Sequence, residues 1–136
     1  MVTQLIIHAD GASRHNPGPA AIGATLRDSQ GKLVASVSRA IGRATNNQAE
    51  YRAVIAALEE ALKLGASQVM VKLDSELVVR QLSGQYRVRQ AGLQPLHRQV
   101  TRLLAQFRQV TISHVPRQQN AEADRLANQA LDTAGH

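Results

Sequence analysis

The chain has 136 residues, of which 43% are hydrophobic and 2% aromatic, so a single domain with a core of Leu, Val, Ile and Ala is expected. It contains no cysteine, which excludes a disulfide framework and a thiolate zinc site, and its formal net charge is +6. No apolar run approaches the roughly 18 residues of a membrane span, and the N-terminus has no signal-peptide pattern. We therefore expect a cytoplasmic protein with one domain over residues 1–132 and a loose C-terminal tail over residues 133–136.

Three strand-like runs open the chain, at residues 3–9, 20–27 and 32–41. Turn-forming residues fill 11–19, between the first two runs. Residues 28–31 end in Gly31 and predict a hairpin between the second and third runs.

The hydrophobic period then changes to that of a helix, which we expect over residues 47–64, with Thr45 or Asn46 as its N-cap. The remaining elements expected are a strand at 68–73, a short helix at 75–82, a helix at 93–107, a strand at 110–115 and a helix at 120–131. A helix between two strands of one sheet makes those strands parallel. The predicted fold class is therefore α/β, a five-stranded mixed sheet with three antiparallel strands, then two parallel ones, flanked by helices on both faces.

Four carboxylates, Asp10, Glu50, Asp74 and Asp124, stand where one predicted element gives way to the next. If these elements pack side by side, the like charges repel one another unless divalent cations bind between them. The acids therefore predict a metal site. Each acid also has an alternative explanation without a metal. Asp10 could be a turn residue and Glu50 a surface acid of a helix. Asp74 could be the N-cap of the helix at 75–82, and Asp124 an acid in the first turn of the last helix.

No acidic residue lies between Glu76 and Glu122, and no lysine lies there either. The basic residues of this stretch are Arg80, Arg87, Arg89, Arg98, Arg102, Arg108 and Arg117. Because the guanidinium group matches phosphate oxygens, the stretch predicts a surface for a polyanion. An ordinary solvated surface is the alternative, and the neighbouring acidic cluster favours the polyanion.

Four separated motifs resemble the type 1 ribonuclease H family. They are Asp10–Gly18 with its Asn-Pro-Gly loop, Thr45–Glu50 at a helix start, Asp74–Ser75 at a strand end, and His114–Asp124. Each motif falls on the expected element, in the family's order. The chain has no Trp and no lysine-rich protrusion, only Gln85–Gln90 in the corresponding place, so it resembles the compact, archaeal-like subgroup.

The resemblance implies a ribonuclease H-like fold and cleavage of the RNA strand of RNA–DNA hybrids, leaving 3′-hydroxyl and 5′-phosphate ends. It implies that the four carboxylates hold two Mg²⁺ or Mn²⁺ ions when substrate is bound, which agrees with the preference of hard cations for oxygen ligands. The substrate-binding residues that it implies are Gly11, Asn16, Thr45, Asn46, Asn47, Gln48, Arg87 and Arg89.

Two further residues are candidates for assisting catalysis. His114 has the family's spacing to Asp124, but it lies at a predicted strand end, where a structural role is the alternative. Arg117 could contact the scissile phosphate in its place. Glu76 is either a fifth carboxylate of the site or a first-turn helix acid, and we favour the second.

Two other functions remain open: a nuclease that acts on double-stranded RNA or RNA–DNA junctions, and a non-catalytic hybrid-binding module. A binding module could lose the acids without harm, and all four are present. We expect a monomer that binds RNA–DNA hybrid, with double-stranded RNA as a further candidate, and no membrane or obligate protein partner.

Overall fold

The structure, a computed structural model, describes residues 3–136. The element order is β1 (Gln4–Ser13), β2 (Gly18–Arg27), β3 (Leu33–Ala44), α1 (Asn46–Lys63), β4 (Gln68–Leu73), α2 (Glu76–Leu82), α3 (Gln94–Leu104), β5 (Gln109–His114), the 3-10 turn η1 (Arg117–Asn120) and α4 (Ala121–Thr133). The predicted α/β class and element order are confirmed. Within the described range, no helix has both the length and the apolar character that a membrane crossing requires.

The sheet has the strand order β3-β2-β1-β4-β5. Its central strand, β1, is antiparallel to β2 and parallel to β4. The prediction that the first strand ends at residue 9 is wrong, because Gly11, Ala12 and Ser13 continue the pairing with β2. The pairing with β4 stops at His8, so Asp10 lies where only one side of β1 is still covered by a neighbouring strand.

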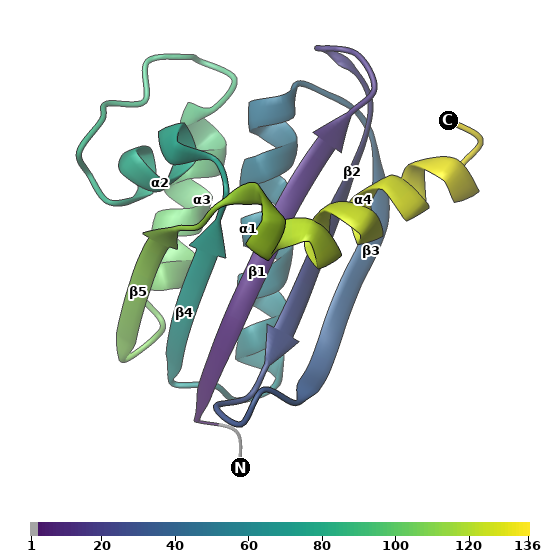
Figure 1. Cartoon of the computed structure of the whole chain (residues 1–136). Helices are drawn as coiled ribbons and strands as arrows, with labels where there is room; N and C mark the ends of the chain where they lie inside the picture. Colours follow the sequence, from purple (N-terminus) through teal and green to yellow (C-terminus); the bar gives the residue numbers. More distant parts are fainter. Residues whose placement is uncertain (1–2) are drawn as a thin grey trace.

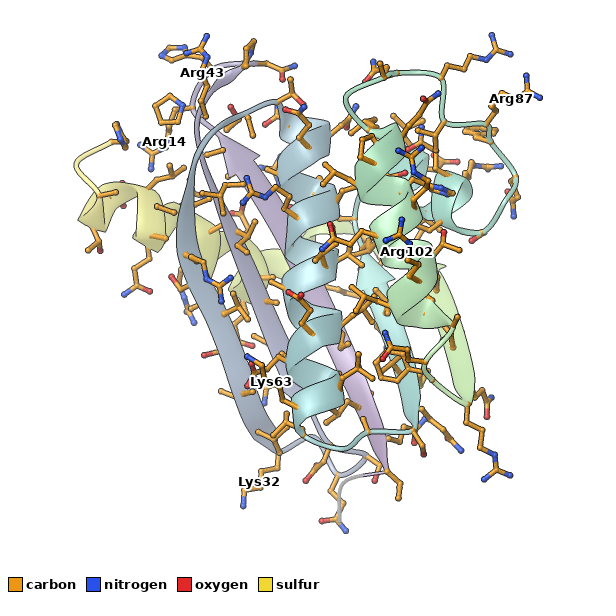
Figure 2. The ribbon with its side chains drawn as sticks, turned by 180° about the vertical axis from the view of Figure 1, so that it is seen from behind. Arg14, Lys32, Arg43, Lys63, Arg87 and Arg102 are labelled. Carbon is orange, nitrogen blue, oxygen red and sulfur yellow. The ribbon has the colours of Figure 1, made fainter. Side chains whose placement is uncertain are left out.

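Helices cover both faces of the sheet, as expected. In Figure 1, α4 crosses the near face over β1, β2 and β3, while α1 and α3 lie behind the sheet; Figure 2 shows that second face directly. α1 packs on β1 and β2, and α3 packs on α1.

The core is mostly aliphatic, and its largest fully buried side chain is that of Tyr51. Tyr51 is fully buried, and its hydroxyl donates a 2.6 Å hydrogen bond to Oε1 of Gln81 on α2. Burial raises the pKa of Tyr51 to about 12, so the hydroxyl keeps its proton and acts as a donor. This bond fixes α2 against the first turns of α1.

Two glycines on neighbouring strands let helices approach the sheet closely. A Cβ at Gly11 would lie 2.2 Å from the carbonyl carbon of Ala49 on α1. A Cβ at Gly23, which pairs with Asp10, would lie 2.1 Å from the carbonyl oxygen of Ala123 on α4. Both distances are far inside van der Waals contact, so only glycine fits at these positions.

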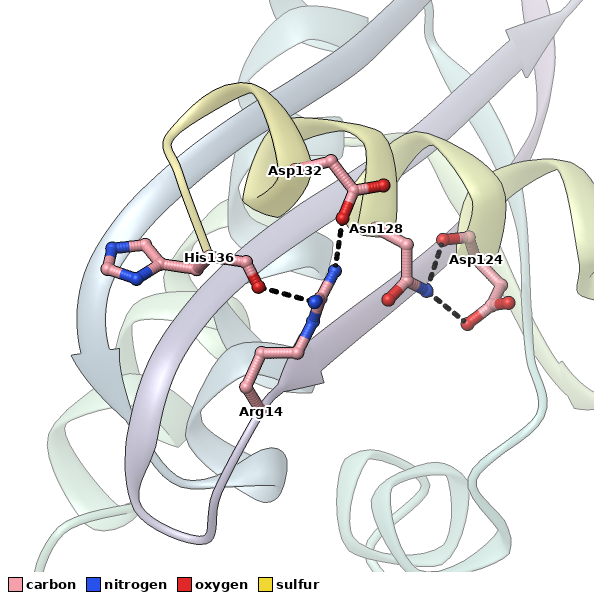
Figure 3. A network of polar contacts seen from close by, with 5 residues as sticks. All are labelled: Arg14, Asp124, Asn128, Asp132 and His136. Atoms are coloured by element: carbon pink, nitrogen blue, oxygen red, sulfur yellow. Dashed lines mark hydrogen bonds and ion pairs between the residues drawn. The ribbon is translucent and has the colours of Figure 1, made fainter.

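The C-terminal end is held by polar contacts. Thr133 belongs to α4, not to the loose tail predicted for residues 133–136, because the helix continues through it. The amide of His136 donates to the carbonyl oxygen of Leu131, and the Arg14 guanidinium bonds both the His136 carbonyl oxygen and, at 2.8 Å, Oδ1 of Asp132 (Figure 3). Arg14 therefore ties the β1–β2 loop to the end of α4.

Replacing Gly23 by alanine should destabilise the protein by about 1–3 kcal/mol, because the new methyl group forces α4 away from the sheet. Urea unfolding monitored by circular dichroism measures this cost. Gly92→Ala is the matched control: its Cβ meets only the flexible end of Gln48, at 3.0 Å, and its effect should stay within about 0.5 kcal/mol. Equal stabilities for the two variants would contradict the close packing of α4.

Candidate metal and nucleic-acid site

A cleft of about 470 Å³ opens where β1 loses its pairing with β4. In mixed sheets, sites gather at the carboxyl ends of parallel strands, and this cleft follows that rule. The residues that line it are Asp10, Gly11, Ala12, Ser13, Asn46, Glu50, Asp74, Ser75, Arg117, Asp124 and Asn128. All four predicted carboxylates are among them.

Three of the carboxylates come close together. Asp10, Glu50 and Asp74 each offer an oxygen, and these oxygens all lie within 4.8 Å of one another. Asp10 is only 6% exposed and Glu50 9%, so neither is the solvated turn or surface helix acid of the alternative explanation. Asp124 lines the same cleft from α4 but stands outside this group of three.

Burial sets the electrostatics of this group. It raises the pKa of Asp10 to about 11, with further contributions from the adjacent Glu50, and it also raises the pKa of Glu50. Oε1 of Glu50 accepts a 3.2 Å hydrogen bond from the amide of Gly11, but its buried Oε2 has no hydrogen-bond partner. An unpartnered carboxylate oxygen in an all-carboxylate group fits a ligand for a hard divalent cation.

Asparagine amides hold Asp74 and Asp124, and sequence reasoning missed both contacts. Nδ2 of Asn120 donates to Oδ1 of Asp74 at 3.3 Å and to the carbonyl oxygen of Ala9 at 2.9 Å. Nδ2 of Asn128 donates to Oδ1 of Asp124 at 3.2 Å. Asn128 could have been found from its spacing of four residues from Asp124 on a predicted helix. Asn120 could not, because an asparagine at a helix start suggests an N-cap.

A network of polar contacts links the β1–β2 loop to the start of α1. Oδ1 of Asn46 accepts from the amide of Ser13 at 3.1 Å, and Oδ1 of Asn16 accepts from the amide of Asn46 at 3.0 Å. Two of the predicted substrate-binding residues, Asn16 and Asn46, are therefore held against each other at the rim of the cleft.

Of the other predicted substrate-binding residues at this end, two cap α1, one lines the cleft and one lies outside the cleft lining. Thr45 and Gln48 form a capping box: Oγ1 of Thr45 accepts from the amide of Gln48 at 3.1 Å, and Oε1 of Gln48 accepts from the amide of Thr45 at 2.9 Å. Gly11 lines the cleft, whereas Asn47 lies in the first turn of α1, half-buried and outside the cleft lining.

The structure separates the two candidates for assisting catalysis. His114 is exposed at the end of β5, and its Nε2 lies 3.3 Å from the backbone oxygen of Asp74. It thus contacts the chain next to the site without lining the cleft, whereas Arg117 lines the cleft directly.

Two predictions for the short second helix can be compared with the structure. The alternative explanation of Asp74 as the N-cap of this helix is wrong: the N-cap is Ser75, whose Oγ accepts from the amide of Val78 at 3.3 Å. Asp74 is thereby left for the acidic group. Glu76 is an exposed first-turn acid paired with Arg80 at 2.7 Å, as the favoured interpretation had it.

The arginines of the acid-free stretch do not form one continuous surface. Arg80 is engaged by Glu76 and its guanidinium carbon lies 5.3 Å from the ring centre of Tyr86. Arg108 directly precedes β5, whose first residue pairs with the first residue of β4, so it lies at the opposite end of the sheet from the cleft.

A smaller set of arginines is gathered around α3. Arg87 and Arg98 line a second hollow, of about 610 Å³, between α2, the loop after it and α3. Arg87 and Arg102 point outward on this side in Figure 2, and Arg89 is exposed on the same loop. Phosphate binding by the stretch would therefore involve this side and Arg117.

Comparisons with known proteins agree on the kind of domain. The family described as "Reverse transcriptase-like" matches residues 8–130. Ribonuclease HI of Halobacterium salinarum is 48% identical over 94% of this chain and 65% of its own length. A crystal structure of RNase H1 from that organism superposes with a TM-score of 0.94 at 46% identity, covering 96% of this chain and 98% of the other.

Two further similarities are to part of a longer protein and to a domain solved with nucleic acid. A bifunctional protein of Mycobacterium tuberculosis is 49% identical over 96% of this chain, which spans only 36% of that protein. The crystal structure of LC11-RNase H1, in complex with an RNA/DNA hybrid, has a TM-score of 0.92 at 39% identity and covers 97% of this chain and 99% of that one.

The raised pKa of Asp10 predicts that the metal-free protein loses stability as the pH rises. In the unfolded chain this carboxyl releases its proton near pH 4, whereas the folded protein retains the proton to about pH 11. The unfolded state therefore binds fewer protons between these values, and the free energy of unfolding falls by up to about 1.4 kcal/mol per pH unit for each such proton.

Asp10→Asn should reduce this slope, to which Glu50 also contributes, and stabilise the metal-free protein at pH 8. Urea unfolding in EDTA between pH 5 and 9 measures both effects. Glu59→Gln, the same change at an exposed position of α1, should leave the slope unchanged. A slope that is the same in the Asp10 variant and the wild type would refute the assignment of buried protonation to this group.

Proposed function

Because the chain belongs to the ribonuclease HI family, we propose that it is an endonuclease that hydrolyses the RNA strand of RNA–DNA hybrids. The observation that carries the proposal is the group formed by Asp10, Glu50 and Asp74, whose oxygens lie within 4.8 Å of one another in an open cleft. The related LC11 enzyme was solved with an RNA/DNA hybrid, which supports the same substrate here. The domain responsible would extend through Thr133.

The proposed cofactors are two divalent cations, Mg²⁺ or Mn²⁺, held by Asp10, Glu50, Asp74 and Asp124. The all-oxygen donor set and the unpartnered Oε2 of Glu50 support this proposal. When bound, such ions supply an activated water and charge neutralisation for in-line displacement at a phosphodiester, which leaves 3′-hydroxyl and 5′-phosphate ends. Asp10 and Glu50 contribute by staying fixed in a buried position.

The remaining residues of the cleft would orient the hybrid. Arg117 lies at the cleft and has the donor geometry to hold a phosphate near the acids. Asn46 uses its Oδ1 to accept from Ser13, so its amide N–H groups remain for a sugar hydroxyl or phosphate. Together with Asn16, it would read the 2′-hydroxyl, the group that distinguishes RNA from DNA.

The first test is cleavage of end-labelled RNA–DNA hybrid, duplex RNA, duplex DNA and an RNA–DNA junction, each with Mg²⁺, Mn²⁺ or EDTA. We expect cleavage of the RNA strand of the hybrid, dependent on a divalent cation. Asp10→Asn should abolish cation-dependent cleavage because it removes a central proposed ligand, and Glu59→Gln should retain full activity. Turnover by the Asp10 variant would refute the metal site, and preferred cleavage of duplex RNA or of the junction would replace the proposed substrate.

The second test concerns the arginines near α3. Hybrid affinity of the Asp10→Asn protein, measured by fluorescence anisotropy in EDTA, should fall steeply with salt. Changing both Arg87 and Arg89 to alanine should reduce the slope of log K against log salt by about 1–2, since each lost phosphate contact contributes about 0.7–0.9. Arg108→Ala, at the opposite end of the sheet, is the control and should leave the slope unchanged. An equal slope in all three proteins would exclude the α3 side from binding.

A further inference from the structure

Asp124 differs from the other three acids in how it is held. It lies on α4, outside the group formed by Asp10, Glu50 and Asp74, and its carboxylate bonds to a neighbour on its own helix. That neighbour, Asn128, also lines the cleft. The position of the fourth carboxylate is therefore set by a contact within α4.

The contact has two parts, both drawn in Figure 3. Nδ2 of Asn128 donates to the backbone oxygen of Asp124 at 3.0 Å and to its Oδ1 at 3.2 Å. The first bond fixes the amide on the helix, and the second fixes the carboxylate relative to the amide. Only one carboxylate oxygen is used, so the other remains available to a cation.

The next polar residue along this face of α4 has a different partner. Asp132, four residues beyond Asn128, accepts from the Arg14 guanidinium at 2.8 Å. In Figure 3, the Asn128 amide is joined to Asp124 and Arg14 to Asp132. The two contacts on this face are thus separate, and no cation of the protein is paired with Asp124 among the residues that the structure describes.

A neutral donor suits a carboxylate that must also bind a cation. An arginine or lysine in its place would orient the carboxylate but would add a positive charge that opposes cation binding. Asp74 shows the same solution independently, since its Oδ1 accepts from the amide of Asn120. Hydrogen bonds of this kind orient metal-binding carboxylates in general.

We propose that Asn128 is a positioning residue that orients the Asp124 carboxylate in the cleft so that it can contribute a ligand to a divalent cation held by Asp10, Glu50 and Asp74. The proposal rests on the proposed function, since it presumes that the acids bind cations. An ordinary helix-surface pair between residues four apart would instead contribute a few tenths of a kcal/mol to stability and nothing to cation binding.

The test separates these two roles by measuring cation affinity and stability in the same variants. Isothermal titration calorimetry with Mn²⁺ alone compares the full chain with its Asn128→Ala, Asn128→Gln and Gln129→Ala variants. Gln129 is an exposed amide on the same helix and serves as the control. Asn128→Ala should raise the Kd for Mn²⁺ about tenfold. It should also raise the Mg²⁺ concentration for half-maximal hybrid cleavage by a similar factor.

The melting temperature of Asn128→Ala in EDTA should be unchanged or higher, because alanine favours the helix. Asn128→Gln, which keeps the donor on a longer side chain, should recover part of the affinity. Mn²⁺ binding by Asn128→Ala that equals that of Gln129→Ala would overturn the positioning role and leave the proposed function standing. If the unchanged chain bound no Mn²⁺, both would fall.

Discussion

The fold has to hold carboxylates of like charge close together and mostly out of water. Asp10 and Glu50 are less than a tenth exposed, and the oxygens of both lie within 4.8 Å of one from Asp74. In the absence of cations this arrangement opposes folding, because burial and mutual repulsion favour the neutral form of each acid. The rest of the fold must supply enough packing energy to tolerate it. Such local destabilisation is characteristic of sites selected for function.

The close approach of two helices meets this requirement. Gly11 admits α1 on one face of the sheet and Gly23 admits α4 on the other, in each case to distances that a side chain would prevent. Because Gly11 follows Asp10 in sequence and Gly23 pairs with it across the strands, both helices approach the sheet closely beside Asp10. The close packing of the two helices and the position of Asp10 therefore depend on the same residues of the sheet.

The order of elements, the parallel or antiparallel sense of the strands and the convergence of the four acids on one cleft could be predicted from the sequence. Hydrophobic period and turn residues are local signals, and the ends of adjacent strands must lie together once the order is known. The loop after the first strand was misjudged because Gly11, Ala12 and Ser13 pair with β2, a tertiary contact that overrides their turn-like composition.

Contacts between side chains were much harder to predict from the sequence. Asn120 suggests a helix cap from its position, yet its amide spans from Ala9 to Asp74 in the buried interior. The capping role assigned to Asp74 belongs to Ser75, one residue later. The arginines form one continuous stretch in the sequence. In the structure, Arg117 lies at the cleft, whereas Arg108 lies at the opposite end of the sheet because β5 runs between them. These outcomes depend on three-dimensional neighbours, which a periodicity does not encode.

The placement of the acids on elements far apart in the sequence also links the proposed binding of cations to folding as a whole. Asp10 comes from the first strand and Asp124 from the last helix, so an intermediate in which α4 has not yet docked would lack one of the four proposed cation ligands. Cations would bind such a species more weakly than the native protein and would therefore shift the population away from it. The unfolding of β1 and α4 should consequently become more cooperative as the concentration of free divalent ion rises.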